Sequence, residues 1–402
     1  MNRIVLIGNG FDLAHGLKTR YEDFINWYWD YRFQGLIDSH TNVTEDILCK
    51  MTCLEKIWTE AIFFDYKLKN SYGIDIYDHL KSNDKKYKVE LSPLFERIMT
   101  SVETKRWVDI ENEYYHLLKK YAIENPSDVN TKELNKQLQY LQDLLIKYLT
   151  IINQAEIETN SYINNKIYSP IRPDDICVEW RKDFKEYINW CINQESSYWI
   201  PKMERYDDRL SIADVDECKR NYQEVYHVNY PRPFMLPDNI MLLSFNYTKT
   251  AQKYHNQNFF LNYIHGELEK PNSVIFGYGD ELDEDFKKLK ELNDNECQRN
   301  VKSIKYLESD SYRNVLAFIE SAPYQVCIMG HSCGNSDRTL LNTLFEHKNC
   351  ISIKPYYYKK EDGTDNYLEL VQNISRNFTD MKLMRDRVVN KTYCETLLDP
   401  TP

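Results

Sequence analysis

A chain of 402 residues can bury a substantial core in one large domain or in two ordinary ones. Its net charge of −11 excludes a broad phosphate-binding surface, which needs an excess of Lys and Arg, so DNA and RNA are not expected as ligands. No stretch approaches the roughly 20 apolar residues of a membrane helix, and the N-terminus has no signal-peptide pattern. We therefore expect a cytoplasmic protein whose ten scattered cysteines, none in a C-x-x-C pair, are buried free thiols.

The first predicted element is a strand at the N-terminus. The run 3–7 is apolar and rich in β-branched residues, and Gly8-Asn9-Gly10 follows it directly. A helical-looking stretch comes next. This order predicts a strand, a tight turn and a helix.

The middle of the chain, roughly residues 21 to 237, shows few strand signals. Apolar residues repeat every three or four positions between Leu134 and Ile152, as on one face of a long helix. The segments 24–33 and 180–192 also read as amphipathic helices with wide aromatic faces. We interpret these stripes as core packing.

Strand patterns return after residue 238. Short apolar runs alternate with helical patterns at 309–321 and 336–347, which favours a mainly parallel sheet. The predicted strands are 239–245, 261–266, 273–279, 324–330 and 350–358. The predicted fold is therefore α/β, a Rossmann-like, mainly parallel sheet flanked by helices, with a large all-helical insertion after the first strand-helix unit. Residues 1–30 and 238–402 would form the sheet domain, and residues 31–237 the insertion.

Glycines gather at the ends of the predicted strands. Of only eleven, eight are placed there: Gly8, Gly10, Gly16, Gly266, Gly277, Gly279, Gly330 and Gly334. Ligands of open parallel sheets bind outside the carboxyl ends of the strands, where a helix N-terminus attracts an anion. However, the dinucleotide fingerprint G-x-G-x-x-G requires Gly or Ala at position 13, and this chain has Leu13. An ordinary tight turn without a ligand is therefore an alternative interpretation.

Polar residues occur at the same strand ends. Asn246 follows one predicted strand, His265 precedes Gly266 at the next, and His331, Ser332 and Asp337 follow a third. Such a gathering is typical of an active site. The alternatives are a structural histidine at 265 and capping of the helix 338–347 by Asp337 or Ser336.

Acidic residues cluster in RWVDIENEYYHLL at 106–118. Asp109, Glu111 and Glu113 would share no helix face at a spacing of two. They are typical either of the first turn of a helix or, if the segment is extended, of a carboxylate site.

The motifs resemble those of a known family. LIGNGFDLAHGLKTRYEDF resembles the signature of the AbiH family of bacterial phage abortive-infection proteins. W-x-D-x-E at 107–111, SFNYT at 244–248 and the His-Gly pair at 265–266 look like that family's later motifs. The matches span nearly the whole chain in the right order.

The same motifs look like a divergent sirtuin-type NAD-binding domain. The first sirtuin motif carries three glycines, which fall on Gly8, Gly10 and Gly16. The conserved sirtuin asparagine falls on Asn246, and the catalytic histidine on His265. By this resemblance Asn246 and His265 are the catalytic residues. The residues that would hold NAD are Gly8, Asn9, Gly10, Phe11, Asp12, Gly16, Tyr21, Gly266, Gly330, His331, Ser332 and Asp337.

Several positions depart from the sirtuin pattern. Lys18 and Arg20-Tyr21 replace the proline and Phe-Arg of the first motif, and Thr248 replaces a conserved aspartate. The four zinc cysteines are absent, which disfavours protein deacylation. The resemblance implies an NAD+ hydrolase in phage defence that releases nicotinamide and ADP-ribose, with NAD as substrate and no metal.

Two other functions stay open. The domain would act as an NAD or ADP-ribose sensor if it binds without turnover, or as a metal-dependent nuclease-type toxin through Asp109, Glu111 and Glu113. The insertion is the candidate for sensing a phage component or partner subunit as trigger, or for forming a homo-oligomer.

Overall fold

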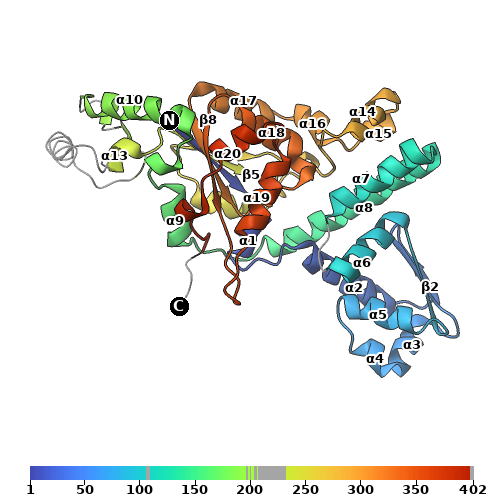
Figure 1. Cartoon of the computed structure of the whole chain (residues 1–402). Coiled ribbons are helices and arrows are strands. Elements are labelled where there is room, and N and C mark those ends of the chain that lie inside the picture. Colours follow the sequence, from blue (N-terminus) through green and yellow to red (C-terminus); the bar gives the residue numbers. More distant parts are fainter. Residues whose placement is uncertain (106–108, 196–197, 200, 203–205, 207–231, 399–402) are drawn as a thin grey trace. The chain divides into compact units, whose positions relative to one another are not determined.

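The computed structural model describes residues 1–105, 109–195, 198–199, 201–202, 206 and 232–398 (Figure 1). The chain forms two compact units, each built from separated segments. The first unit comprises Met1–Gly16, Glu156–Val274 and Tyr306–Pro402, and the second comprises Leu17–Ala155 and Ile275–Lys305. These boundaries divide the chain differently from the predicted split after residues 30 and 237.

The first unit contains a five-stranded parallel sheet in the order β6-β5-β1-β7-β8. Its strands are β1 (Asn2–Ile7), β5 (Ile240–Ser244), β6 (Phe260–Tyr263), β7 (Tyr324–Met329) and β8 (Cys350–Tyr356). The chain runs outward from β1 through β5 to β6, then returns to the other side of β1 for β7 and β8. This is the doubly wound order, and its switch point lies between β1 and β7. The predicted fold class is confirmed.

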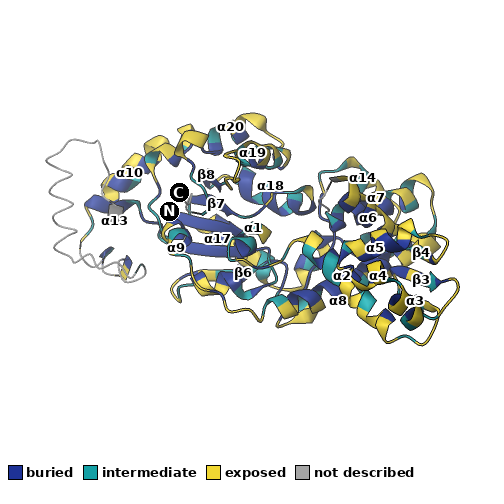
Figure 2. Cartoon of the chain, turned by 90° about the horizontal axis from the view of Figure 1, so that it is seen from below, coloured by how far each residue is buried: buried dark blue, intermediate teal, exposed yellow. Residues whose placement is uncertain are grey.

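The strands form where the sequence has short apolar runs without polar alternation. All residues of β1, β5, β7 and β8 are buried, as expected of a parallel sheet covered on both faces. Figure 2 shows β7 and β8 in the dark blue of buried residues. Only β6, at one edge, has exposed positions.

Helices cover the two faces of this sheet. Ile163 and Ile167 of α9 (Ser161–Ile167) pack in one core cluster with Val5 of β1 and Leu242 of β5. Helix α18 (Arg338–Glu346) connects β7 to β8 and, in Figure 1, lies on the opposite side of the strands from α9. The other helices of this unit are α1 (Asn9–Leu13), α10 (Arg181–Ile192), α13 (Arg232–Met235), α17 (Ser311–Ser321), α19 (Tyr367–Arg376) and α20 (Met381–Arg387).

One predicted strand is wrong. Residues 273–279 form no strand of the sheet, and only Tyr278 makes an isolated bridge, with Val301 in the second unit. Gly277 has φ +157°, and a Cβ there would lie 2.0 Å from the carbonyl oxygen of Asn300. Gly277 therefore serves packing in the second unit, and neither Gly277 nor Gly279 marks the end of a strand.

The second unit is mainly helical, with the long α8 (Asp128–Ile152) covering the predicted stripe. Its other helices are α2 (Tyr21–Ile37), α3 (Trp58–Phe64), α4 (Tyr66–Lys69), α5 (Ile74–Ser82), α6 (Pro93–Lys105), α7 (Ile110–Lys119), α14 (Glu284–Glu291), α15 (Asn295–Gln298) and α16 (Lys302–Lys305). The prediction of an all-helical insertion missed an antiparallel sheet of β2 (Val43–Glu45), β3 (Cys49–Cys53) and β4 (Tyr87–Leu91). Burial alternates along β3, the period that a half-buried strand requires.

The cysteines match expectation where the structure describes them. Nine are free and buried, and Cys218 lies outside the described residues. In the described part of the chain, no helix combines the length and the apolar character needed to cross a membrane.

Candidate active site

The candidate site lies at the switch point of the sheet, where the turn after β1 meets the end of β7. The Gly10 N–H donates to the Gly330 carbonyl at 2.8 Å. A Cβ on Gly8 would lie 2.4 Å from the Cα of His331, and one on Gly330 would lie 2.1 Å from the Phe11 nitrogen. These glycines therefore allow two backbone segments to touch, and Gly330 also adopts φ +77°.

This contact uses the amides that were expected to hold a pyrophosphate. The N–H groups of Gly8, Gly10 and Phe11 donate to the carbonyls of Met329, Gly330 and Gly8, respectively. Helix α1 has only five residues, so its N-terminus is a weak anion site. The expected phosphate cradle is thus occupied by the chain's own backbone.

Other predicted cofactor residues lie in varied places. Phe11 is fully buried in the core, against the ring of Tyr254 at 5.3 Å between ring centroids. Asn9 and Ser332 are exposed, and the Ser332 carbonyl accepts from Asn373 at 2.9 Å. Tyr21 begins α2 in the second unit.

Two further glycines have separate structural reasons. Gly16 has φ +76° with open space around it. Gly266 has φ +83°, and a Cβ there would lie 2.1 Å from the carbonyl oxygen of Ser273.

Asp12, on α1, is a buried carboxyl group beside this switch point. Its side chain is only 1% exposed, and Oδ2 accepts a hydrogen bond from the Thr248 hydroxyl at 2.7 Å. Oδ1 has no partner among the described residues. Burial raises the pKa of Asp12 to about 6, although hydrogen bonds from Thr248 and its neighbours act to lower it. Asp12 therefore combines a perturbed pKa with a free acceptor, which is typical of functional carboxyls.

Asn246 lies beside Asp12, just after β5. Its Nδ2 donates to the Gly8 carbonyl at 3.0 Å, which ties the end of β5 to the end of β1. The Asn246 side chain also acts to lower the pKa of Asp12, against the larger effect of burial. With its nitrogen engaged, the amide oxygen is the group suited to accept from a ligand.

The most distinctive feature is a carboxylate shared by two histidines. Asp337 approaches His265 Nε2 with Oδ1 at 3.2 Å and His331 Nε2 with Oδ2 at 3.4 Å. All three side chains are buried. Asp337 stands at the N-cap position of α18, as the capping alternative expected, but its side chain makes no capping bond to that helix.

His265 is oriented for proton transfer. Its Nε2 faces Asp337 and lies 3.3 Å from the Tyr306 hydroxyl, whereas Nδ1 has no partner among the described residues. A carboxylate on one ring nitrogen fixes the tautomer and leaves the other nitrogen as a base. The Phe245 ring packs against His265 at 5.3 Å and against His331 at 4.1 Å between centroids.

Sequence reasoning missed four of these neighbours. Thr248 stood in a motif already singled out, and Phe245 stood next to Asn246, so both had a local signal. Cys333, two residues after His331, also had a local signal, whereas Tyr306 carried none, because only the fold brings it to His265. Asp337 and His331, expected among the residues that hold NAD, lie against each other, and Asp337 also contacts His265.

The acidic residues of the second unit take part in a helix cap and in ion pairs. Asp109 caps α7 by accepting from the Asn112 N–H at 3.0 Å. Glu111 is buried, and its Oε2 pairs with Lys302 at 2.9 Å while Oε1 accepts from the Gly277 N–H at 3.1 Å. Glu113 pairs with Arg97 in the same way.

This pairing bears on the nuclease alternative. Within the described ranges no group of three or more His, Cys, Asp or Glu side chains is arranged to bind a metal ion. Trp107 of the W-x-D-x-E motif lies outside those ranges.

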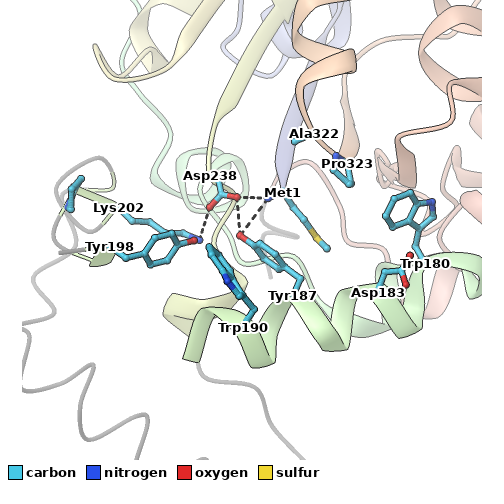
Figure 3. Close-up of a pocket in the computed structure, with 11 residues that line it drawn as sticks. Met1, Trp180, Asp183, Tyr187, Trp190, Tyr198, Lys202, Asp238, Ala322 and Pro323 are labelled. Atoms are coloured by element: carbon cyan, nitrogen blue, oxygen red, sulfur yellow. Dashed lines mark hydrogen bonds and ion pairs between the residues drawn. The ribbon is translucent and has the colours of Figure 1, made fainter. Parts of the chain in front are cut away.

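A separate cavity of about 640 Å³ opens at the opposite edge of the sheet, where the strands begin (Figure 3). Aromatic side chains of α10, including Tyr187 and Trp190, line it. Asp238 accepts from the Tyr187 hydroxyl at 2.8 Å and from Lys202 at 2.9 Å. Although burial acts to raise it, the Met1 ammonium and Lys202 lower the pKa of Asp238 to about 2.

The described geometry can be compared with known protein families. The model of the family "Bacteriophage abortive infection AbiH" matches residues 4–358, nearly the whole chain. The chain belongs to the AbiH family. A role in abortive infection, a defence against phage, is therefore the general function of this AbiH protein.

The matched range of the AbiH model includes every residue of the candidate site, from Gly8 to Asp337. No curated protein and no solved structure matches the chain.

Proposed function

We propose that this AbiH protein is an NAD+ glycohydrolase that releases nicotinamide and ADP-ribose. The observation that carries the proposal is His265, whose Nε2 faces Asp337 while its Nδ1 has no partner among the described residues. It lies just beyond β6, at the carboxyl edge of a doubly wound sheet, where such folds bind nucleotides. The resemblance of the motifs around Asn246 and His265 to sirtuins supports NAD as the substrate.

The reaction suits a site with one general base and no general acid. The bond between the ribose C1′ and nicotinamide breaks, and its electron pair neutralises the cationic pyridinium, so the leaving group needs no proton. Water adds to C1′ and gives its proton to His265 Nδ1. Asp337 then stabilises the imidazolium that forms.

Asn246 and Asp12 provide acceptors for the ribose. The Asn246 amide oxygen would orient the attacking water or a ribose hydroxyl. The free Oδ1 of Asp12 fits a hydroxyl or the nicotinamide amide and would repel a phosphate. Because the N–H groups of Gly8, Gly10 and Phe11 are already paired, the pyrophosphate would need other contacts or a local opening of this turn.

The test is chromatographic separation of products after the pure protein is incubated with NAD, with and without phage lysate. We expect nicotinamide and ADP-ribose in equal amounts, and a fall of at least about 100-fold for His265→Ala and for Asn246→Ala. His255→Ala is the control, because His255 bonds the Phe259 carbonyl outside this cluster.

Two outcomes would contradict the proposal. Undiminished turnover by His265→Ala would show that His265 is not the base. Binding of ADP-ribose without any nicotinamide release, with or without phage lysate, would indicate a sensor. The same variants in phage-challenged cells should lose protection in proportion to their loss of turnover.

A further inference from the structure

Two histidines contact Asp337, and their surroundings give them different capabilities. The Nε2 of His265 faces the carboxylate, and its Nδ1 has no hydrogen-bond partner among the described residues. His331 has both nitrogens engaged, with Nε2 on Asp337 Oδ2 and Nδ1 accepting from the Cys333 N–H at 3.0 Å. His331 is therefore no candidate for the base, although it lies in the same cluster.

The contact from Cys333 defines the tautomer of His331. A nitrogen that accepts a hydrogen bond from a backbone N–H presents its lone pair and carries no proton. The single ring proton must then be on Nε2, which faces Asp337. His331 is thus neutral and directs its Nε2–H toward the carboxylate, 3.4 Å from Oδ2.

Cys333 adopts an unusual backbone conformation to make this contact. Its φ is +55°, a left-handed value that non-glycine residues seldom adopt. The Asn377 Nδ2 donates to its carbonyl at 2.9 Å, and the Cys333 side chain is fully buried. Backbone strain that the surroundings hold in place is concentrated at functional sites.

The neutrality of His331 matters for Asp337. A cation at this position would neutralise the carboxylate, whereas a neutral donor orients it and leaves its charge for His265. Occupation of Oδ2 by His331 also directs Oδ1 toward His265.

We propose that His331, held as its neutral Nε2–H tautomer by the Cys333 amide, is a positioning residue that orients Asp337 toward His265. This proposal rests on the proposed hydrolysis of NAD+ by the same site. It reassigns His331 from direct contact with the dinucleotide to action through Asp337.

The chain contains a matched control. His347, outside the candidate site, has the same local pattern: its Nδ1 accepts from the Asn349 N–H at 3.2 Å, and its Nε2 faces Glu320 at 3.1 Å. His347→Ala therefore removes equivalent bonds away from the reacting groups.

The first test is the tautomer, and it needs no turnover. In ¹⁵N-detected NMR of the histidine rings of the full chain at neutral pH, we expect the His331 proton on Nε2 and an unprotonated Nδ1, as for His347. A protonated Nδ1 in His331 would overturn the proposal that the Cys333 amide fixes the Nε2–H tautomer, whether or not the protein hydrolyses NAD+.

The second test is kinetic. We expect His331→Ala to lower kcat for nicotinamide release by about tenfold or more with little change in KM, and His331→Gln, whose amide can still donate to Asp337, to restore most of it. His347→Ala should leave kcat unchanged. A raised KM with unchanged kcat in both His331 variants would instead indicate contact with the dinucleotide and overturn the proposal. A wild-type protein that has the expected His331 tautomer but releases no nicotinamide would count against the proposed hydrolysis of NAD+. It would still establish that the Cys333 amide fixes the tautomer of His331.

Discussion

At the scale of single residues, the burial of Asp12 makes the stability of the fold depend on pH. Its pKa is raised to about 6 because the charged form is poorly solvated, and the hydrogen bond from Thr248 and the polar groups beside it do not offset this. Between about pH 4 and 6 the folded protein therefore binds a proton that the unfolded chain has released. It follows that this group makes the fold less stable as the pH rises through that window.

Asp12→Asn should remove this dependence while keeping an acceptor for Thr248. A pKa of about 6 against an ordinary 3.8 predicts that the stability of Asp12→Asn relative to wild type improves by about 1.4 kcal/mol between pH 5 and pH 8. Urea unfolding at the two pH values measures it. The exposed Asp310→Asn variant is the control, and a difference for Asp12→Asn that does not change with pH would contradict the prediction.

At the scale of elements, the turn from β1 into α1 is shaped by its contact with the end of β7. Gly330 and Gly16 have nearly the same positive φ, +77° and +76°. They differ in surroundings, since a Cβ on Gly330 would meet the Phe11 nitrogen at 2.1 Å and one on Gly16 would meet nothing within 4 Å. Comparing Gly16 with Gly330 therefore separates the cost of a left-handed backbone from the cost of a steric clash.

We expect Gly16→Ala to lower the free energy of unfolding by about 1 kcal/mol, the cost of a left-handed backbone alone. Gly330→Ala should cost about 3 kcal/mol or more, because the backbone at the switch point must shift as well. Urea unfolding curves compare the two variants. Equal losses would mean that the contact between the two backbone segments adjusts freely.

The strands of the parallel sheet could be predicted because each is a short apolar run buried on both faces, as in 324–330. The run 273–279 is also short and mostly apolar, but at Gly277 it packs against Asn300. Local composition does not predict that contact. The antiparallel sheet had a local signal, since polar and apolar residues alternate along β4, but it lies among strong helical patterns.

The sequence indicated which residues lie at the candidate site better than it indicated which of them contact each other. Asn246, His265 and Asp337 could be singled out because they follow strands whose ends share one edge. That Asp337 bridges His265 and His331 depends on the strand order and on the short helical turn before α18, which no local pattern encodes. The engaged amides of Gly8 and Gly10 were equally beyond a sequence pattern, because their acceptors lie in another part of the chain.

At the scale of the whole molecule, the candidate site belongs entirely to the first unit. Its residues come from four strand ends that are far apart along the chain. The second unit has its own buried network, in which Glu111 pairs with Lys302. Ligand binding and the acidic motif can therefore be tested separately.

Hydrogen exchange with added ADP-ribose provides that test. Ligand that binds only the folded state slows exchange where it stabilises structure. We expect slower exchange in residues 8–16, 245–248 and 330–337, and no change in α8. Mass-spectrometric exchange on the full chain measures this, and protection confined to the second unit would place the ligand elsewhere.

The separation of the site's parts along the chain has a consequence for biosynthesis. Asn246 bonds the Gly8 carbonyl across 238 positions, and Arg3 at the start of β1 bonds Gln325 across 322. While the ribosome is still synthesising the middle of the protein, β1 has neither of its neighbouring strands. Contacts of such long range form late. A nascent chain that ends before β7 therefore lacks Asp337 and His331, and His265 in such a chain has no carboxylate partner at this site.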